Sequence, residues 1–193
     1  MNNLVLYGAI AALIVIAILA WRLLANRRPV PEQLRQGSRL PDFEAYDESG
    51  NVVRSGDLTG APAVMLFVRG NWCPFCNSQV KNLTKYYKDI VDLGARLIFV
   101  TPKPLETTRR VAKFYEVDFD FWLDDSLAVA RQLGLLLPEG VPKSHVGEYG
   151  SDTVWPTSLV IDSEGQIVYV NLSKFIADRP DPKALLGAIQ QTL

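Results

Sequence analysis

The sequence predicts an α/β domain at residues 41–193, behind an N-terminal transmembrane helix and a short linker. Two continuous apolar runs, PAVMLFVR at 62–69 and ARLIFVT at 95–101, are bounded by turn residues and are typical of buried strands. Segments with helical periodicity alternate with them, which is the order of an α/β protein. We therefore expect a central mixed sheet with helices on both faces.

The other elements are expected in the following order. The segment 43–58 reads as a hairpin that turns at Ser49, Gly50 and Asn51. A helix should follow the two cysteines and end at Gly94, with an apolar face of Val80, Leu83, Tyr87, Ile90 and Val91. A further helix is expected at 104–116 and a third strand at 119–124.

The C-terminal third should begin with a helix at 125–134, capped by Asp125 or Ser126 and closed by Gly134. Residues 135–155 are rich in glycine and proline and are expected to be mostly loop. The runs 157–162 and 166–172 predict a second hairpin, and the chain should end in a helix with Asp181 as cap and Pro182 at its first position.

The composition fits a folded domain, with 48% hydrophobic and 21% charged residues and a net charge of −1. No basic face stands out, so a nucleic-acid partner is not expected. Two cysteines cannot build a disulfide framework or a four-thiolate metal site, and His145 does not complete one. A C-x-x-C pair can be half of a zinc site, but a second half is missing, so no metal is predicted.

Residues 1–28 are interpreted as a membrane anchor with a basic flank, and 29–40 as a linker. Leu4–Trp21 carries no charge, and a helix of about 20 apolar residues spans the roughly 30 Å hydrocarbon layer. The lipid bilayer is therefore expected to contact residues 4–21. The alternative is a cleaved signal peptide, which fits poorly because no basic residue precedes the run.

The charges around this segment predict its orientation. The preceding residues contain no Lys or Arg, whereas five arginines and one acid, Glu32, follow: Arg22, Arg27, Arg28, Arg35 and Arg39. We expect a single-pass protein of the cell inner membrane, and by the positive-inside rule its domain should face the cytoplasm. A periplasmic domain is the alternative, since disulfide chemistry is commoner there.

Both cysteines lie in RGNWCPFCNSQV at 69–80, between a buried strand and a helix. Cys73 falls at the helix cap, where free N–H groups and the helix dipole stabilise a thiolate, and Cys76 lies one turn further on the same face. Pro74 suits the first helical turn. We expect an exposed attacking sulfur on Cys73 and a sheltered resolving sulfur on Cys76. Two inert core cysteines are the alternative.

At this point the chain resembles the thioredoxin superfamily, and more closely its alkyl hydroperoxide reductase/thiol-specific antioxidant (peroxiredoxin-like) branch, over about 40–193. The similar segments are VMLFVRGNWCPFCNSQVKNL, FDFWLDDSLAVARQLGL and WPTSLVIDSEGQIVYV. The resemblance implies a thioredoxin-like fold, an attacking Cys73, a resolving Cys76 and an aromatic Trp72 before them. It also implies that Pro156 follows a cis peptide bond beside the redox pair, and that the Cys73–Cys76 disulfide replaces any cofactor.

The chain departs from peroxiredoxins in their Pro-x-x-x-Thr/Ser-x-x-Cys loop. Leu66 and Gly70 occupy the proline and hydroxyl positions, and no arginine stands in DTVW just before Pro156. Arg69 and Arg131 are candidates to supply the missing charge. These departures weaken the expectation of peroxidase activity and leave disulfide exchange untouched.

The predicted function is that of a membrane-anchored thiol–disulfide oxidoreductase acting on protein disulfides and served by a thiol reductant. A thiol peroxidase acting on hydroperoxides and a non-enzymatic binding module are the alternatives. His145 is interpreted as a solvated loop residue, and the pair Asp124 and Asp125 as helix capping rather than metal binding. Trp122 and Trp155 are assigned to core packing, with a groove near the thiols as the other possibility.

Overall fold

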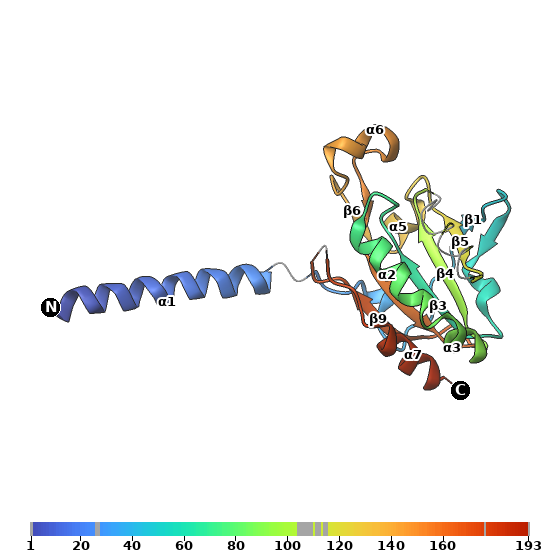
Figure 1. Cartoon of the computed structure of the whole chain (residues 1–193), viewed down its shortest axis with the longest axis horizontal. Coiled ribbons are helices and arrows are strands. Elements are labelled where there is room, and N and C mark those ends of the chain that lie inside the picture. The colour runs from blue at the N-terminus through green and yellow to red at the C-terminus, as the bar shows by residue number, and fades with distance from the viewer. Residues whose placement is uncertain are drawn as a thin grey trace.

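The computed structural model describes residues 2–25, 28–103, 110, 113, 116–175 and 177–192. Its strands form a sheet with helices on either side, and α1 extends away from this domain (Figure 1). The helices are α1 (Asn2–Ala25), α2 (Pro74–Thr84), α3 (Tyr87–Asp92), α5 (Ala128–Gln132), α6 (Val146–Tyr149) and α7 (Pro182–Gln190), with short 3-10 turns η1 (Glu32–Leu34), η2 (Ser55–Leu58) and η3 (Lys143–His145). The strands are β1 (Glu44–Tyr46), β2 (Val52–Arg54), β3 (Ala63–Phe67), β4 (Arg96–Thr101), β5 (Asp120–Leu123), β6 (Leu136–Leu137), β7 (Thr153–Val154), β8 (Thr157–Ile161) and β9 (Ile167–Leu172).

The main sheet has seven strands in the order β2-β1-β5-β4-β3-β8-β9. Strands β3, β4 and β5 run parallel, and the pairs β3–β8, β8–β9, β1–β5 and β1–β2 are antiparallel. The predicted central mixed sheet and both predicted hairpins are therefore confirmed. The order also places the carboxyl end of β3, where the redox loop begins, between β4 and the start of β8.

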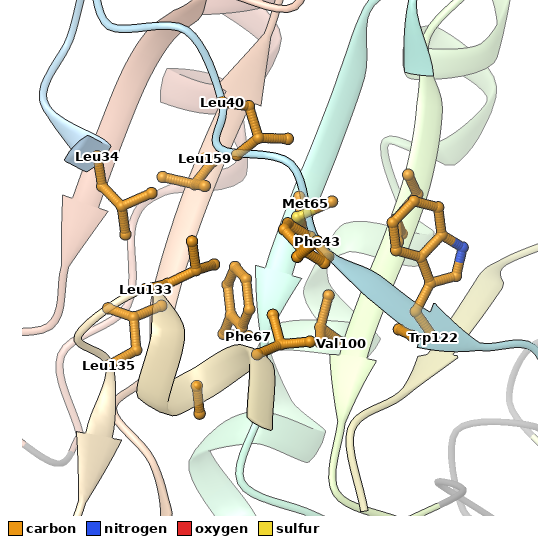
Figure 2. Close-up of a cluster of buried hydrophobic side chains, with 14 of the residues drawn as sticks. Leu34, Leu40, Phe43, Met65, Phe67, Val100, Trp122, Leu133, Leu135 and Leu159 are labelled. Atoms are coloured by element: carbon orange, nitrogen blue, oxygen red, sulfur yellow. The ribbon is translucent and has the colours of Figure 1, made fainter. Parts of the chain in front are cut away.

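Strand β3 is buried on both faces, as its unbroken apolar run predicts. Alternate residues feed two separate clusters: Ala63, Met65 and Phe67 join one, whereas Val64 and Leu66 join the other. Figure 2 shows the first cluster, in which Phe67 and Met65 lie with Phe43, Val100 and Leu133, among others. The second cluster contains both cysteines, so the redox pair is part of the packed interior.

Helices cover both faces. Helices α2, α3 and α7 supply the second cluster with Val80, Leu83, Ile90, Leu185 and Ile189. Helix α5 and the segment before β1 supply the first cluster with Leu34, Leu40, Phe43, Val129 and Leu133. The final helix begins as predicted, because the Asp181 side chain accepts a hydrogen bond from the Lys183 N–H and Pro182 occupies the first turn.

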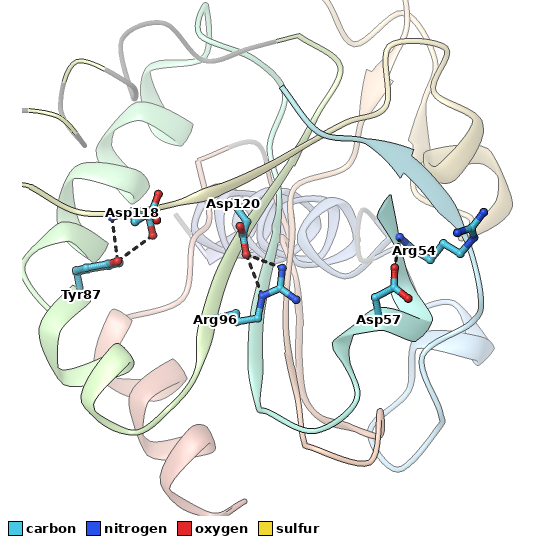
Figure 3. Close-up of polar contacts among 6 residues, drawn as sticks. All are labelled: Arg54, Asp57, Tyr87, Arg96, Asp118 and Asp120. Carbon is cyan, nitrogen blue, oxygen red and sulfur yellow. Dashed lines mark hydrogen bonds and ion pairs between the residues drawn. The ribbon is translucent and has the colours of Figure 1, made fainter. Parts of the chain in front are cut away.

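Polar contacts tie the edges of this framework together (Figure 3). The Arg96 guanidinium donates from Nε and Nη2 to Asp120 Oδ2, at 3.0 and 2.8 Å, and so links β4 to β5. The Tyr87 hydroxyl donates to the Asp118 carbonyl and accepts from its N–H, both at 2.9 Å. The Arg96–Asp120 pair is half exposed, so it contributes little free energy and mainly fixes position.

Two predicted helix details are wrong. The helix after the cysteines is divided, because α2 ends at Thr84 and α3 begins at Tyr87; Ile90 is buried, but Val91 is exposed. Helix α5 is capped by neither Asp125 nor Ser126, whereas the capping role expected of Asp124 is confirmed. The buried Asp124 carboxylate at the end of β5 accepts hydrogen bonds from the Val129 and Ala130 N–H groups, at 3.0 and 2.9 Å. The Asp124 carboxylate lies one residue before the expected start of the helix, and it provides acceptors for the free N–H groups of the first turn.

Residues 135–155 contain more structure than the expected loop. Strands β6 and β7 pair antiparallel in a small second sheet, and η3 and α6 lie between them. We call residues 138–152 the insertion. The helix predicted at 104–116 falls largely outside the described residues.

The described side chains of helix α1, at positions 7–21, are exposed, and the exposed fraction of both Tyr7 and Trp21 is 68%. Within the described part of the chain, no helix is both long and apolar enough to cross a membrane. The predicted transmembrane helix is therefore not supported.

Candidate functional site: the Cys73–Cys76 pair

The redox loop connects the buried end of β3 to the start of α2. Cys73 is the N-cap of α2, with extended backbone angles, and its Sγ accepts a hydrogen bond from the Cys76 N–H at 3.4 Å. Pro74 occupies the first turn, where a missing N–H costs nothing. The helix start therefore lies where the sequence predicts it, and the Cys76 N–H of its first turn points toward the first sulfur.

The two sulfurs are in direct contact. The Cys76 thiol donates to Cys73 Sγ with the sulfur atoms 2.9 Å apart, and both cysteines are free. This hydrogen bond is the largest cause that lowers the pKa of Cys73, to about 6; the Cys76 N–H and the charges of Arg179 and Arg69 lower it further, against the effect of burial. The same bond, together with burial, raises the pKa of Cys76. This order of acidity supports Cys73 as the nucleophile.

Cys73 is not exposed, contrary to the sequence prediction. Its exposed fraction is 1% and that of Cys76 is 0%. A helix cap on an isolated element would face solvent, but here the loop is enclosed by segments from elsewhere in the chain. Both sulfurs are therefore shielded from water, which strengthens every charge interaction around them.

One cation in contact with both sulfurs, Arg179, is a residue that the sequence analysis missed. Arg179 lies between β9 and α7, and its Nη2 atom lies 3.2 Å from Cys76 Sγ and 3.8 Å from Cys73 Sγ. It is 106 residues from Cys73 in sequence, so no local motif connects the two. A positive charge that the chain lacks just before Pro156 is thus present on the segment that follows β9, at the same end of the β8–β9 hairpin.

Arg69 also belongs to the site, whereas Arg131 does not. The Arg69 side chain is buried, donates to the Gly140 carbonyl and lies 4.4 Å over the Trp72 ring. Burial lowers its pKa, and the neighbouring Cys73 opposes this effect. Arg131 is exposed and donates instead to the Ser126 carbonyl.

The insertion packs on the redox loop. The half-buried His145 ring stacks on Trp72 with centroids 6.0 Å apart, and Tyr149 meets the same ring edge-on at 6.3 Å. The Tyr149 hydroxyl donates to the Asn71 side chain. His145 is therefore a neighbour of the site rather than a freely solvated loop residue.

The tryptophans predicted for the core lie there. Trp122 is 2% exposed in the first cluster, and Trp155 packs against that cluster while its Nε1 donates to the Ser173 carbonyl at 2.6 Å.

The backbone and surroundings of Gly70 explain why this position does not carry a serine or threonine hydroxyl. Its φ is +126°, a conformation that side chains rarely adopt. A Cβ atom there would lie 2.8 Å from Tyr149 Cε1 and 3.1 Å from Trp72 Nε1. A threonine or serine at this position would conflict with both the backbone and the insertion.

Pro156 lies beside the loop, but its predicted cis bond is wrong. Strand β8 begins at Thr157, which pairs with Phe67 at the end of β3, so Pro156 lies at the same edge as the redox loop. The described residues contain no cis peptide bond. Trans is favoured by about 0.5–1 kcal/mol even before proline. The alignment of Pro156 with the proline of thioredoxin folds loses that support.

The arrangement is suited to two-electron thiol chemistry. An ionised sulfur and a protonated one are in contact, beside two cations and away from water. Among the residues that the structure describes, no group of three or more His, Cys, Asp or Glu side chains is placed to hold a metal ion.

Comparisons with known proteins agree with this geometry. The chain is 22% identical over 133 residues to a protein named Peroxiredoxin Bcp from Bacillus subtilis, covering 68% of this chain and 81% of the relative. It is 25% identical over 138 residues to a protein named Thiol-disulfide oxidoreductase ResA from Halalkalibacterium halodurans, covering 71% and 68%.

The fold is shared with solved structures. Peroxidoxin BcpB from Mycobacterium tuberculosis superposes with a TM-score of 0.64 at 21% identity, covering 82% of this chain and 97% of that one. The model of the AhpC/TSA family matches residues 36–170, which is well over half of the chain and includes the redox pair. The chain is therefore an oxidoreductase of the thioredoxin superfamily and belongs to the AhpC/TSA family.

Proposed function

We propose that this protein is a thiol–disulfide oxidoreductase that exchanges electrons with protein disulfides through Cys73 and Cys76. The observation that carries the proposal is the contact between the two sulfurs, 2.9 Å apart, with the pKa of one lowered to about 6 and that of the other raised. One sulfur is ready to attack, and the other keeps its proton until the first has reacted.

The reaction proceeds in two displacements. The Cys73 thiolate attacks a client disulfide; a Cys73–client bond forms, the client S–S bond breaks, and one client sulfur leaves as a thiolate. The Cys76 sulfur then attacks Cys73, releases the second client thiolate and passes its proton to a leaving sulfur. The client gains two electrons and the Cys73–Cys76 disulfide forms. An external dithiol reductant returns the pair to the reduced state.

A thiol peroxidase is the second candidate, favoured by Arg69 and Arg179 beside the nucleophile. In that reaction Cys73 attacks the distal oxygen of a hydroperoxide, the O–O bond breaks, and the alkoxide takes a proton to leave as an alcohol. Cys76 then condenses with the sulfenic acid and releases water. Gly70 argues against this role, because its position cannot hold the hydroxyl expected in peroxiredoxins.

A side-by-side assay separates the two candidates. The reduced full-length protein is mixed either with a disulfide-bonded protein or with an alkyl hydroperoxide, and loss of thiols is followed. Faster reaction with the disulfide supports the proposal; faster reaction with the hydroperoxide replaces it with the peroxidase.

Two single variants test the assigned roles. Cys76→Ser should accumulate a mixed disulfide with the client, whereas Cys73→Ser should form none, because the nucleophile is absent. A mixed disulfide formed by Cys73→Ser instead would reverse the roles of the two cysteines.

We also propose that residues 4–21 attach the protein to the inner membrane, with the domain on the cytoplasmic side. Attachment is supported by the exposed apolar side chains at positions 7–21. The orientation is supported by the arginines that follow this segment. Recovery of the full chain in the soluble fraction after cell lysis would exclude attachment. Protease digestion of the domain in intact spheroplasts would place it in the periplasm.

A further inference from the structure

A buried serine, Ser173, helps to anchor the segment that carries Arg179. Ser173 directly follows β9 and is 2% exposed. Its N–H donates to the Pro156 carbonyl at 3.0 Å, and its own carbonyl accepts from Trp155 Nε1 at 2.6 Å. Both backbone groups are thus fixed against the segment that leads into β8.

The Ser173 side chain extends this anchoring to the arginine. Its hydroxyl donates to the Asp178 carbonyl at 2.6 Å and accepts from Arg179 Nη1 at 3.4 Å. Arg179 Nη1 donates to the same Asp178 carbonyl at 2.6 Å. The Ser173 hydroxyl thus adds to two other bonds that close this turn, from the Lys174 N–H to Asp178 Oδ2 at 2.8 Å and from the Asp178 N–H to the Phe175 carbonyl at 3.0 Å. It is the contact of this turn that also reaches the guanidinium from the Ser173 side.

The opposite edge of that guanidinium reaches the sulfurs. Nη2 contacts Cys76 Sγ at 3.2 Å and Cys73 Sγ at 3.8 Å, so the two terminal nitrogens connect the serine to the redox pair. An arginine side chain has many rotamers. Holding one of them with Nη2 against the sulfurs requires that Nη1, the other terminal nitrogen, also has a fixed partner.

We propose that Ser173 is a positioning residue for the redox pair: it holds the Arg179 guanidinium against Cys73 and Cys76 and so favours the thiolate of Cys73. It acts through Arg179 and touches neither sulfur. Arg69, Arg179 and Cys76 are the charged or titratable groups that lower the pKa of Cys73, and among these three described residues it is Arg179 that contacts Ser173. The role rests on the proposed thiol chemistry and specifies how the protein tunes it.

A double-mutant cycle of Ser173 and Arg179 tests whether the serine acts on Cys73 through the arginine. The reduced full-length protein is alkylated with iodoacetamide across a range of pH, and the modification of Cys73 is read by mass spectrometry. Arg179→Ala should reduce the thiolate fraction at pH 6 roughly five-fold, the result of a rise of about one pKa unit from a value near 6. Ser173→Ala should reduce it by a smaller factor, about two-fold.

The double variant distinguishes positioning from a merely structural role. Ser173→Ala should have no further effect on thiol ionisation in the Arg179→Ala background, because its effect passes through the arginine. Ser173→Thr, which keeps the hydroxyl, should restore ionisation. Ser158→Ala is the matched control. Ser158 is as buried as Ser173 and its hydroxyl accepts from Gln79 Nε2 at 3.1 Å, so this variant also removes a buried hydrogen bond.

Three results would overturn the proposal: an unchanged pKa of Cys73 in Ser173→Ala, an equal effect of Ser173→Ala with and without Arg179, or the same loss of ionisation in Ser158→Ala. The readout needs no client. Failure of the wild-type protein to reduce disulfides would therefore remove the proposed function and leave this cycle to be judged on its own.

Discussion

Two distant segments meet the redox loop, and they do so with different chemistry. The insertion contributes ring contacts from His145 and Tyr149 to Trp72 and a backbone carbonyl to Arg69. The segment after β9 contributes a guanidinium to the sulfurs themselves. The insertion thus fixes the shape of the loop and holds Arg69, whereas the later segment places Arg179 directly against the sulfurs. The comparison separates the residues that should control stability from those that should control thiol acidity.

Gly70→Ala gives the largest expected effect on the free energy of unfolding and tests the contact between the loop and the insertion. The positive φ alone costs a side chain about 1–3 kcal/mol, and the new Cβ would also press on the Tyr149 ring. The free energy of unfolding, measured by urea denaturation, should fall by at least about 1 kcal/mol. Adding Tyr149→Ala should recover only the part of the lost unfolding free energy that comes from the clash with the Tyr149 ring. A Gly70→Ala variant as stable as the wild type would mean that the insertion does not confine the loop.

Cys76→Ala tests how the thiol itself shares in the acidity of Cys73. In the wild type, alkylation of Cys73 should rise as pH increases through about 6, because its folded pKa is depressed and the reactive thiolate is lost below that value. Removing the donor thiol should raise this midpoint by about one pKa unit or more, which corresponds to about 1.4 kcal/mol. Cys76→Ser, whose hydroxyl still donates, is the matched control and should shift it less.

An unchanged midpoint in Cys76→Ala would assign the acidity of Cys73 to the arginines and the helix start instead.

Tyr149→Phe should have the smallest effect. It removes the hydrogen bond to Asn71 and keeps the ring against Trp72, so the free energy of unfolding should fall by about 0.5–1.5 kcal/mol. The pH midpoint of Cys73 alkylation should not move, because the groups that lower the pKa of Cys73 are Cys76, Arg179 and Arg69. A shift in that midpoint would break the division of roles between the two segments.

Local patterns in the sequence determined much of this molecule. The apolar runs of β3 and β4, the turns of both hairpins, the Asp181–Pro182 start of α7 and the Cys73 cap of α2 were all predicted, because each depends on neighbours a few residues away. The spacing of the cysteines also predicted their contact, since residues at i and i+3 share a face of a helix.

Only the tertiary structure decided what surrounds that pair. The burial of Cys73, the packing of the insertion on Trp72 and the arrival of Arg179 all arise from contacts between segments far apart in the chain. A local pattern records which residues form an element and which face is apolar, but it does not record which loop will cover its end. The capping of α5 by Asp124, rather than by Asp125 or Ser126, likewise follows from the packed context, whereas the trans bond before Pro156 is the isomer that X–Pro bonds favour intrinsically. The sequence by itself thus determined the reactive pair, and the fold decided its charge and its access to solvent.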